Sequence, residues 1–417
     1  MADTVPGGAA THVLGIDSGG SGVRVGVARA DAYGGYAAEN PLTGPPPLTW
    51  SSSTPAVVGA RGIDAEDLLA RVLPAARELL HEAGARRLGA VCVGAAGMAT
   101  LGEDLRTRLP AALADALGVR RLALAADAVT AYAGALGQHP GAVVAAGTGL
   151  VALGAVPEGV MERVAVRGAE GLGGASEPDD ATGTGALPGT GGVPGALRTG
   201  GAPGGGGAPS TGGPSSTGAA SGGGAAAPRG DTRWAATGWR RADGWGHLLG
   251  DCGGGAWIGR AGLEAAMRAY DGRDGGSKPL LARLEAVFGP ATGLPGKLYP
   301  RPDRPAVLAS FAPEVGRCAG EDPVAQAILR TAARHIAEAA EAVCPRLESS
   351  GVALTGGLFR MGAPLLTPVR EELAARLSGV PVTEAAGDPL DGALCVAAAL
   401  ATDELRLPRD AALLSVV

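Results

Sequence analysis

The sequence has few aromatic residues, no large excess of charge of either sign, no long apolar run and no cysteine pair of the C-x-x-C type. Aromatic residues make up 3% of its 417 positions, and the formal net charge is −6. A chain without a basic excess is not suited to bind nucleic acid or an anionic membrane surface. No stretch approaches the ~18 consecutive apolar residues of a membrane-spanning helix, and residues 1–11 lack the basic and apolar segments of a secretion signal. The sequence therefore predicts a cytoplasmic protein with neither a nucleic-acid nor a membrane partner.

The cysteines give no sign of a disulfide framework or a metal site. There are five of them, an odd number, and no two stand in a C-x-x-C spacing. We therefore expect free, buried thiols, as in a reducing compartment. Cys252 has no evident partner base and is not expected to act as a nucleophile.

Glycine, by contrast, is abundant and unevenly distributed. The chain has 72 glycines among its 417 residues, more than twice the usual ~7%. Residues 168–230 hold 23 of them, together with 7 prolines and no Phe, Trp, Tyr, Ile or Cys. Such a segment cannot bury enough apolar surface to offset the entropy of ordering it. The sequence therefore predicts a disordered surface insertion at 168–230 and a globular remainder large enough for two lobes.

Outside this insertion, strand and helix patterns alternate along both halves of the chain. An apolar run at 12–17, a Ser-Gly-Gly-Ser-Gly turn at 18–22 and an alternating run at 23–28 predict a hairpin. A hairpin of the same form is predicted at 142–154, around a Gly-Thr-Gly turn. The further elements expected are helices at 64–83, 102–117, 128–136, 255–270, 322–343, 363–377 and 390–402, and strands at 90–94, 122–125, 352–355 and 381–385.

Because both halves open with a hairpin and continue in strand–helix alternation, we expect a duplicated, two-lobed α/β architecture. The N-terminal lobe is expected at 12–137. The C-terminal lobe is expected at 138–390, interrupted by the insertion. A C-terminal helix and tail at 391–417 are expected to pack back toward the N-terminal lobe.

The glycine turns are candidate phosphate-binding sites. Turns at 18–22 and 147–149 can present backbone N–H groups to an anion, because glycine permits positive φ and has no Cβ. A third glycine pair at 356–357 could let an adenine or ribose approach the backbone. Asp17, at the end of the first strand, could hold Mg²⁺ through water. The first turn is neither a Walker A loop nor a dinucleotide fingerprint, because it lacks Gly-Lys-Ser/Thr and leads into a strand.

Asp127 stands where a strand is predicted to end and a helix to begin. An acid at that place is favoured by the helix dipole for structural reasons alone. It is equally suited to act as the general base for a substrate hydroxyl in phosphoryl transfer. The residues by themselves leave both interpretations open.

Residues 243–259 are rich in glycine and contain two of the five tryptophans. We expect a compact loop with an apolar wall and close backbone approach. Asp251 in this loop can accept a hydrogen bond from a sugar hydroxyl. His247 is expected to be a structural histidine rather than a base or a ligand.

Taken together, these motifs resemble the BadF/BadG/BcrA/BcrD ATPase family, and within it the N-acetylglucosamine kinases and related bacterial sugar kinases. The resemblance rests on Gly15-Ile-Asp-Ser-Gly-Gly-Ser-Gly22, Ala126-Asp-Ala128, Gly147-Thr-Gly149, Gly244-Trp-Gly-His-Leu-Leu-Gly-Asp251 with Trp257-Ile-Gly-Arg260, and Thr355-Gly-Gly357. It runs from about residue 12 to 402 outside the insertion. It implies the two-lobed actin/hexokinase/Hsp70-like (ribonuclease H-like) fold, with ATP and Mg²⁺ held between the lobes.

The resemblance also implies a role for each matching residue. Asp127 would be the catalytic base and Asp17 would organise Mg²⁺. The nucleotide would contact Gly19, Gly20, Ser21, Gly147, Thr148, Gly149, Gly356 and Gly357. The sugar would contact Asn40, Asp127, Gly149, Leu150, Trp245 and Asp251. The implied reaction is ATP-dependent phosphorylation of an amino sugar, N-acetylglucosamine or glucosamine, at a primary hydroxyl.

Two departures from the family pattern keep other functions open. Leu150 stands where relatives usually have serine, and Cys252 where they usually have glutamate. One alternative is an ATPase that activates a partner enzyme, although relatives of that kind hold an iron–sulfur cluster with cysteines whose spacing is absent here. The other alternative is a non-catalytic sugar or nucleotide sensor. The expected ligands are a sugar and ATP, and a homodimer stays open.

Overall fold

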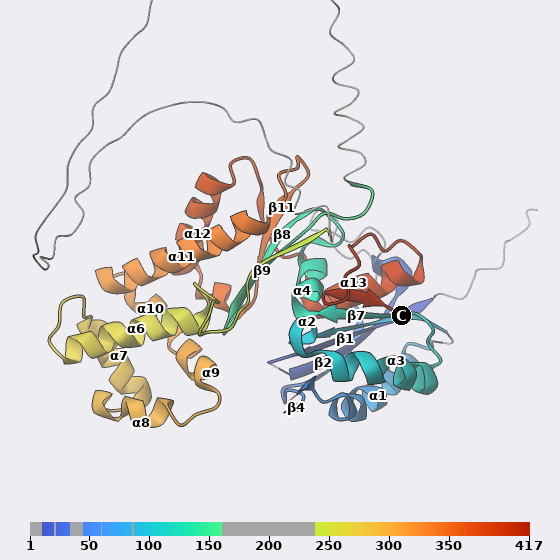
Figure 1. Cartoon of the computed structure of the whole chain (residues 1–417), viewed down its shortest axis with the longest axis horizontal. Helices are drawn as coiled ribbons and strands as arrows, with labels where there is room; N and C mark the ends of the chain where they lie inside the picture. Colours follow the sequence, from blue (N-terminus) through green and yellow to red (C-terminus); the bar gives the residue numbers. More distant parts are fainter. Residues whose placement is uncertain (1–10, 21, 34–44, 60, 86, 161–237) are drawn as a thin grey trace, which may run out of the picture. The chain divides into compact units, whose positions relative to one another are not determined.

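The computed structural model describes residues 11–20, 22–33, 45–59, 61–85, 87–160 and 238–417 (Figure 1). All of these residues belong to one compact unit. The predicted insertion at 168–230 and the candidate residues Ser21 and Asn40 lie outside the described residues.

The first sheet is built mainly from the N-terminal part of the chain. Its strands are β1 (His12–Gly19), β2 (Gly22–Arg29), β3 (Leu48–Ser52), β6 (Leu88–Ala95), β7 (Leu122–Ala126) and β13 (Leu414–Val416), in the order β13-β7-β6-β1-β2-β3. The central strand β1 is antiparallel to β2 and parallel to β6. Two short strands, β4 (Val58–Gly59) and β5 (Gly62–Ile63), form a separate hairpin.

The second sheet repeats this arrangement. Its strands are β8 (Gly141–Ala146), β9 (Leu150–Ala155), β10 (Trp239–Asp243), β11 (Gly351–Thr355) and β12 (Val382–Glu384), in the order β10-β9-β8-β11-β12. Its central strand β8 is antiparallel to β9 and parallel to β11. The order and directions are those of β3-β2-β1-β6-β7 in the first sheet. The predicted fold class, a duplicated two-lobed α/β fold of the actin and hexokinase type, is confirmed.

Two helices connect the sheets (Figure 1). Helix α4 (Asp127–Leu136) contacts strands of both sheets, and α13 (Pro389–Ala401) packs on α4 and on β1 and β6. Close packing of α13 requires small residues, because a Cβ on Gly15 of β1 would collide with Leu394. The other helices of the first sheet are η1 (Ala30–Tyr33), α1 (Ala65–Glu82), α2 (Met98–Leu101) and α3 (Glu103–Leu117).

The second sheet carries a larger helical layer. It comprises α6 (Gly255–Tyr270), α7 (Lys278–Phe288), η3 (Ala291–Gly293), α8 (Leu294–Leu298), α9 (Arg304–Ala309), α10 (Ala312–Cys318), α11 (Pro323–Val343), η4 (Gly357–Met361) and α12 (Ala363–Arg376). Helix α11 packs on β8, β9 and β10, and α12 packs on α11. The apolar side chains of this layer form a hydrophobic core distinct from the core around the first sheet.

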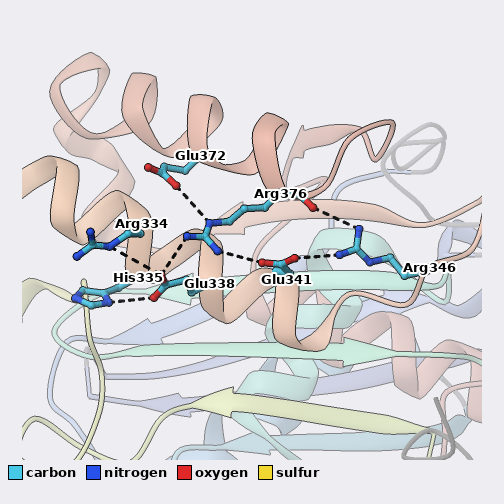
Figure 2. A network of polar contacts seen from close by, with 7 residues as sticks. All are labelled: Arg334, His335, Glu338, Glu341, Arg346, Glu372 and Arg376. Carbon is cyan, nitrogen blue, oxygen red and sulfur yellow. Dashed lines mark hydrogen bonds and ion pairs between the residues drawn. The ribbon is translucent and has the colours of Figure 1, made fainter. Parts of the chain in front are cut away.

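An ion-pair network ties α11 to α12 at the surface (Figure 2). Arg376 of α12 lies 3.1 Å from Glu338 and 3.2 Å from Glu341 of α11, and 3.3 Å from Glu372 on its own helix. Exposed pairs of this kind stabilise weakly one by one. Together they favour one register between two helices that already share a buried apolar contact.

The predicted elements agree with the structure over most of the described chain. The helix predicted at 255–270 is α6, and those at 64–83 and 322–343 are α1 and α11. The prediction missed β3, β10 and β13, which are short edge strands. It also missed helices α7 to α10, each short and all four with proline in the first turn. Among the described residues, no helix is long and apolar enough to cross a membrane. All five cysteines are free; Cys252 and Cys318 are half-buried rather than buried as predicted.

Candidate active site

The turn between β8 and β9 is held in place by the helix that follows the tryptophan-rich loop. The Gly147 and Thr148 carbonyls accept hydrogen bonds from Gly255 N at 2.9 Å and Ala256 N at 2.8 Å. These donors belong to the first turn of α6, whose N–H groups have no partner within the helix. The turn and the start of α6 are therefore one rigid unit.

The glycines of the turns fall into two groups. A Cβ on Gly19, Gly20, Gly147 or Gly357 would meet no atom within 4 Å. These four positions leave open space, in which a ligand can approach the backbone.

Other glycines are required by the protein itself. Gly356 has φ +107°, and a Cβ there would collide with the Ala146 carbonyl oxygen. A Cβ on Gly149 would collide with the Asp251 carboxylate. In the first hairpin it is Gly22, with φ +135°, that adopts a conformation L residues avoid.

Arg24 clamps Asp17 at the end of β1. The two residues are cross-strand partners in the hairpin. Arg24 Nε and Nη2 donate to the same oxygen, Asp17 Oδ2, at 3.0 and 2.7 Å. Arg24 Nη1 donates to Asp388, the N-cap residue of α13. Burial raises the pKa of Asp17 above its ordinary value, and the neighbouring Arg24 charge lowers it in part.

A cavity of about 810 Å³ opens beside Asp17. From the first sheet it is lined by Asp17, Gly19 and Arg24, and from α4 by Asp127. The second sheet and its following segments contribute Thr355, Gly356, Gly357, Phe359, Arg360, Arg370, Thr383 and Glu384. The cavity therefore combines two glycine turns, an aromatic wall and exposed arginines, which suits a nucleotide with its phosphates.

Asp127 is the first residue of α4, directly after β7. Its Oδ1 accepts a hydrogen bond from Ala128 N at 2.8 Å. Solvent reaches the side chain, but protein surrounds the carboxyl closely, and this desolvation raises its pKa; the negative charge of Asp17 adds to the rise, while Ala128 N–H and Arg241 lower it. A carboxylate with a raised pKa is a better proton acceptor than an ordinary aspartate.

A second cavity, of about 450 Å³, meets the first at Asp127. It is lined by Gly97, Thr100, Ala126, Asp127, Gly147, Thr148, Gly149, Leu150, Arg241, Gly244, Gly246, Asp251 and Gly356, among others. Asp127 is the one titratable residue that lines both cavities among the residues described. The geometry thus places two ligand-sized spaces on either side of a single carboxylate.

The loop between β10 and α6 is folded around two aspartates. Asp251 has φ +55° and accepts a hydrogen bond from Gly246 N at 3.1 Å. Asp243, with φ +62°, accepts hydrogen bonds from the backbone N–H groups of Asp251 and Cys252. Asp251 is only 9% exposed, and burial raises its pKa. Asp243 therefore positions the segment that carries Asp251.

The remaining candidate sugar residues lie at different depths. Leu150 is 2% exposed and belongs to the core of the second sheet. Trp245 is 61% exposed and lines neither cavity; its ring lies under the Arg241 guanidinium, 4.2 Å from ring centroid to Cζ. His247 and Cys252 line neither cavity.

Five functional candidates were missed from the sequence: Arg24, Arg241, Asp243, Arg360 and Arg370. A signal for Arg24 was present, because a hairpin closed at residues 19 and 22 pairs positions 17 and 24. The others depend on tertiary contacts that no local pattern encodes.

The donors fit a magnesium–nucleotide complex better than a metal bound by protein alone. In the described part of the chain, no group of three or more His, Cys, Asp or Glu side chains is placed to hold a metal ion. Mg²⁺ commonly takes one or two carboxylates together with substrate phosphates and water. Asp17, beside the open backbone of Gly19, meets that requirement.

Comparisons with known proteins agree with this geometry. Residues 239–398 match the model of the BadF/BadG/BcrA/BcrD ATPase family, so the resemblance noted in the sequence is confirmed over that segment. A search of curated protein sequences finds no match.

Two solved structures share the fold. One is a Chromobacterium violaceum protein provisionally described as an N-acetylglucosamine kinase, with 22% identity and a TM-score of 0.57 over 92% of this chain and 98% of that one. The other, from Porphyromonas gingivalis, carries the same description, with 14% identity and a TM-score of 0.51 over 92% and 97%.

Proposed function

Because residues 239–398 match the BadF/BadG/BcrA/BcrD ATPase family, we propose that this chain is an ATP-dependent sugar kinase. It phosphorylates a primary hydroxyl of an amino sugar, N-acetylglucosamine or glucosamine. The observation that carries the proposal is the place of Asp127, on the shared wall of two cavities. In phosphoryl transfer from one bound ligand to another, the carboxylate that accepts the hydroxyl proton must lie where the two ligands meet.

The larger cavity is the proposed ATP site. The open backbone at Gly19 and Gly357 gives the phosphates and the nucleoside room to approach, and Arg360 and Arg370 add positive charge on its wall. Asp17 would hold Mg²⁺, with Arg24 fixing the carboxylate through Oδ2. When bound, ATP would supply the phosphoryl group, and Mg²⁺ would neutralise the negative charge that develops during the transfer.

The smaller cavity is the proposed sugar site. Asp127 Oδ1 is engaged with Ala128 N, which leaves Oδ2 for the sugar hydroxyl. As the hydroxyl oxygen attacks the γ-phosphorus of ATP, its proton would pass to Asp127, and the bond from that phosphorus to the bridging oxygen would break to release ADP. Asp251 and Thr148 line the same cavity. In this proposal Asp251 accepts hydrogen bonds from other sugar hydroxyls, and the Thr148 hydroxyl donates to them. The choice of an amino sugar follows the descriptions of the two structural neighbours.

A coupled assay of ADP release over a sugar panel tests the proposal. We expect turnover to depend on an added sugar and to fall ~10²–10⁴-fold in Asp127→Asn, the range for loss of a general base. Asp115→Asn, which removes an exposed acid of α3, is the matched control. Folded protein that releases no ADP with any sugar, or an Asp127→Asn variant that keeps full activity, contradicts the proposal.

If calorimetry shows that ATP and a sugar bind but no product forms, the chain is a sensor instead. Sugar-independent ATP hydrolysis would favour an ATPase that drives a partner.

A further inference from the structure

The smaller cavity contains one cation, Arg241. Its lining residues within the described chain include two acids, Asp127 and Asp251, and no other basic side chain. Arg24, Arg360 and Arg370 line only the larger cavity. Among the residues that the structure describes, Arg241 is therefore the one positive charge that lines the smaller cavity.

The strand β10 directs this side chain into the cavity. Alternate residues of a strand share a face, so Trp239, Arg241 and Asp243 point the same way. Trp239 packs edge-on against Tyr132 of α4, with 5.5 Å between ring centroids, and Asp243 holds the loop of Asp251. The face that carries Arg241 is thus the one turned to α4 and to Asp127 at its start.

Trp245 orients Arg241, whose charge lowers the pKa of Asp127, but among the described residues no carboxylate forms an ion pair with it. Its guanidinium stacks on the Trp245 ring, which fixes the group without using its N–H donors. It is half-buried, and within the described residues no hydrogen bond or ion pair occupies its five donors. A partly desolvated guanidinium without an anion is costly, and a bound anionic group removes that cost.

The two acids do not meet this need. Asp251 accepts the Gly246 N–H and packs against the Gly149 backbone. Asp127 forms a hydrogen bond with Ala128 N and faces the junction of the cavities. Neither forms an ion pair with Arg241. Both carboxylates can accept hydroxyl protons or hydrogen bonds, and neither can bind an anion.

We propose that the sugar substrate carries an acidic substituent, a carboxylate or a phosphate ester, and that Arg241 binds it. This inference rests on the proposed kinase function and adds the charge class of its substrate. Because the primary hydroxyl must stay free to attack phosphorus, the acid cannot be a carboxylate at that carbon. It is carried instead at the anomeric carbon, on the nitrogen substituent or on the oxygen of a hydroxyl group attached to the ring.

Matched pairs of sugars test this inference. N-acetylglucosamine and its 3-O-lactyl ether differ by a carboxylate, and glucosamine and glucosamine 1-phosphate differ by a phosphate. We expect kcat/KM to be higher for an acidic member by about 10-fold or more, the size of a charge-assisted hydrogen bond. The pair of sugars that shows the higher kcat/KM for its acidic member identifies the acidic group as a carboxylate or as a phosphate.

Substitution of Arg241 tests whether this residue causes the preference for the acidic sugar. Arg241→Gln is expected to reduce kcat/KM for the acidic sugar by about 10- to 100-fold more than for its neutral partner. Arg241→Lys should restore part of the preference. Arg330→Gln, which removes an exposed arginine of α11 outside both cavities, is the charge-matched control.

Two results would overturn the inference while leaving the kinase function intact: a wild-type preference for the neutral sugars, or an equal loss for both members of a pair in Arg241→Gln. Calorimetric titration of each sugar tests the same preference without turnover. Failure of the kinase function would appear separately, as the absence of any sugar-dependent ADP release.

Discussion

Arg24 holds Asp17 by donating twice to one carboxylate oxygen, Oδ2, from adjacent strands of the first hairpin. The arrangement fixes the side chain without covering Oδ1. It also opposes the effect of burial, since the Arg24 charge lowers the Asp17 pKa that burial raises. In the proposed kinase this pair sets both the geometry and the ionisation of the residue that holds magnesium.

Arg24→Gln should therefore change the pH dependence of activity. Without the Arg24 charge the pKa of Asp17 rises further, so a larger fraction is protonated at a given pH. The acid limb of the kcat/KM profile for Mg²⁺–ATP should move to higher pH, and affinity for Mg²⁺–ATP at pH 7 should fall by about tenfold. An unchanged acid limb would show that Asp17 does not need to be ionised.

Asp127→Asn should stabilise the protein while it inactivates it. The pKa of Asp127 is higher in the folded than in the unfolded chain, so its ionised form opposes folding above that raised pKa. Asparagine removes this cost, and the melting temperature at pH 7 should rise. Near pH 3 the gain should disappear, because the carboxyl is then mostly protonated in both states. Differential scanning calorimetry at both pH values checks this; a lower melting temperature at pH 7 would contradict it.

Gly356→Ala and Gly357→Ala form a matched pair in one turn. Alanine at 356 meets the Ala146 carbonyl and an unfavourable φ, and should lower the free energy of unfolding by about 1–3 kcal/mol or more. Alanine at 357 meets no protein atom, so stability should be kept. Because Gly357 lines the larger cavity, its substitution should instead raise the KM for ATP. Equal stability of the two variants, or an unchanged KM in Gly357→Ala, would contradict this account.

Asp243→Ala should weaken sugar binding more than ATP binding. The substitution removes the acceptor for the Asp251 and Cys252 N–H groups, and a buried donor without a partner costs about 1–3 kcal/mol. We expect the KM for the sugar to rise about tenfold with little change in the KM for ATP. Asp243→Asn keeps an acceptor oxygen and tolerates the positive φ, so its effect should be smaller. Equal rises in both KM values would contradict a selective role of Asp243 in the sugar site.

The duplicated fold was accessible from the sequence because local signals repeat in both halves. Each half opens with two apolar runs around a glycine turn. Helices such as α11 have a continuous apolar face, and an acidic N-cap residue, Asp322, marks where α11 begins. Edge strands lack such signals. In β10, Trp-Arg-Arg-Ala-Asp reads as polar, and only its pairing with β9 makes it a strand.

The candidate site was accessible in part, for a related reason. Asp17, Asp127 and the turn glycines stand at strand ends that the fold brings together, so their motifs point to them. Arg241 and Asp243 act through contacts with the Trp245 ring and with the backbone of the loop that follows β10. Such contacts are created by the packing of β10 and are not visible in residue spacing. The sequence allowed positive φ at the turn glycines. Gly19 and Gly147 do not adopt it; the absence of a Cβ there leaves open space beside the backbone.

The most direct test of the central claim, that Asp127 joins a nucleotide cavity to a sugar cavity, is product analysis with ³²P-labelled ATP. Wild-type protein incubated with [γ-³²P]ATP and the best sugar of the panel should form a labelled sugar phosphate. Asp127→Asn should bind both ligands in calorimetry and form ~10²–10⁴-fold less labelled product per unit time. Labelled inorganic phosphate with no labelled sugar from the wild type, or undiminished transfer by Asp127→Asn, would contradict the account.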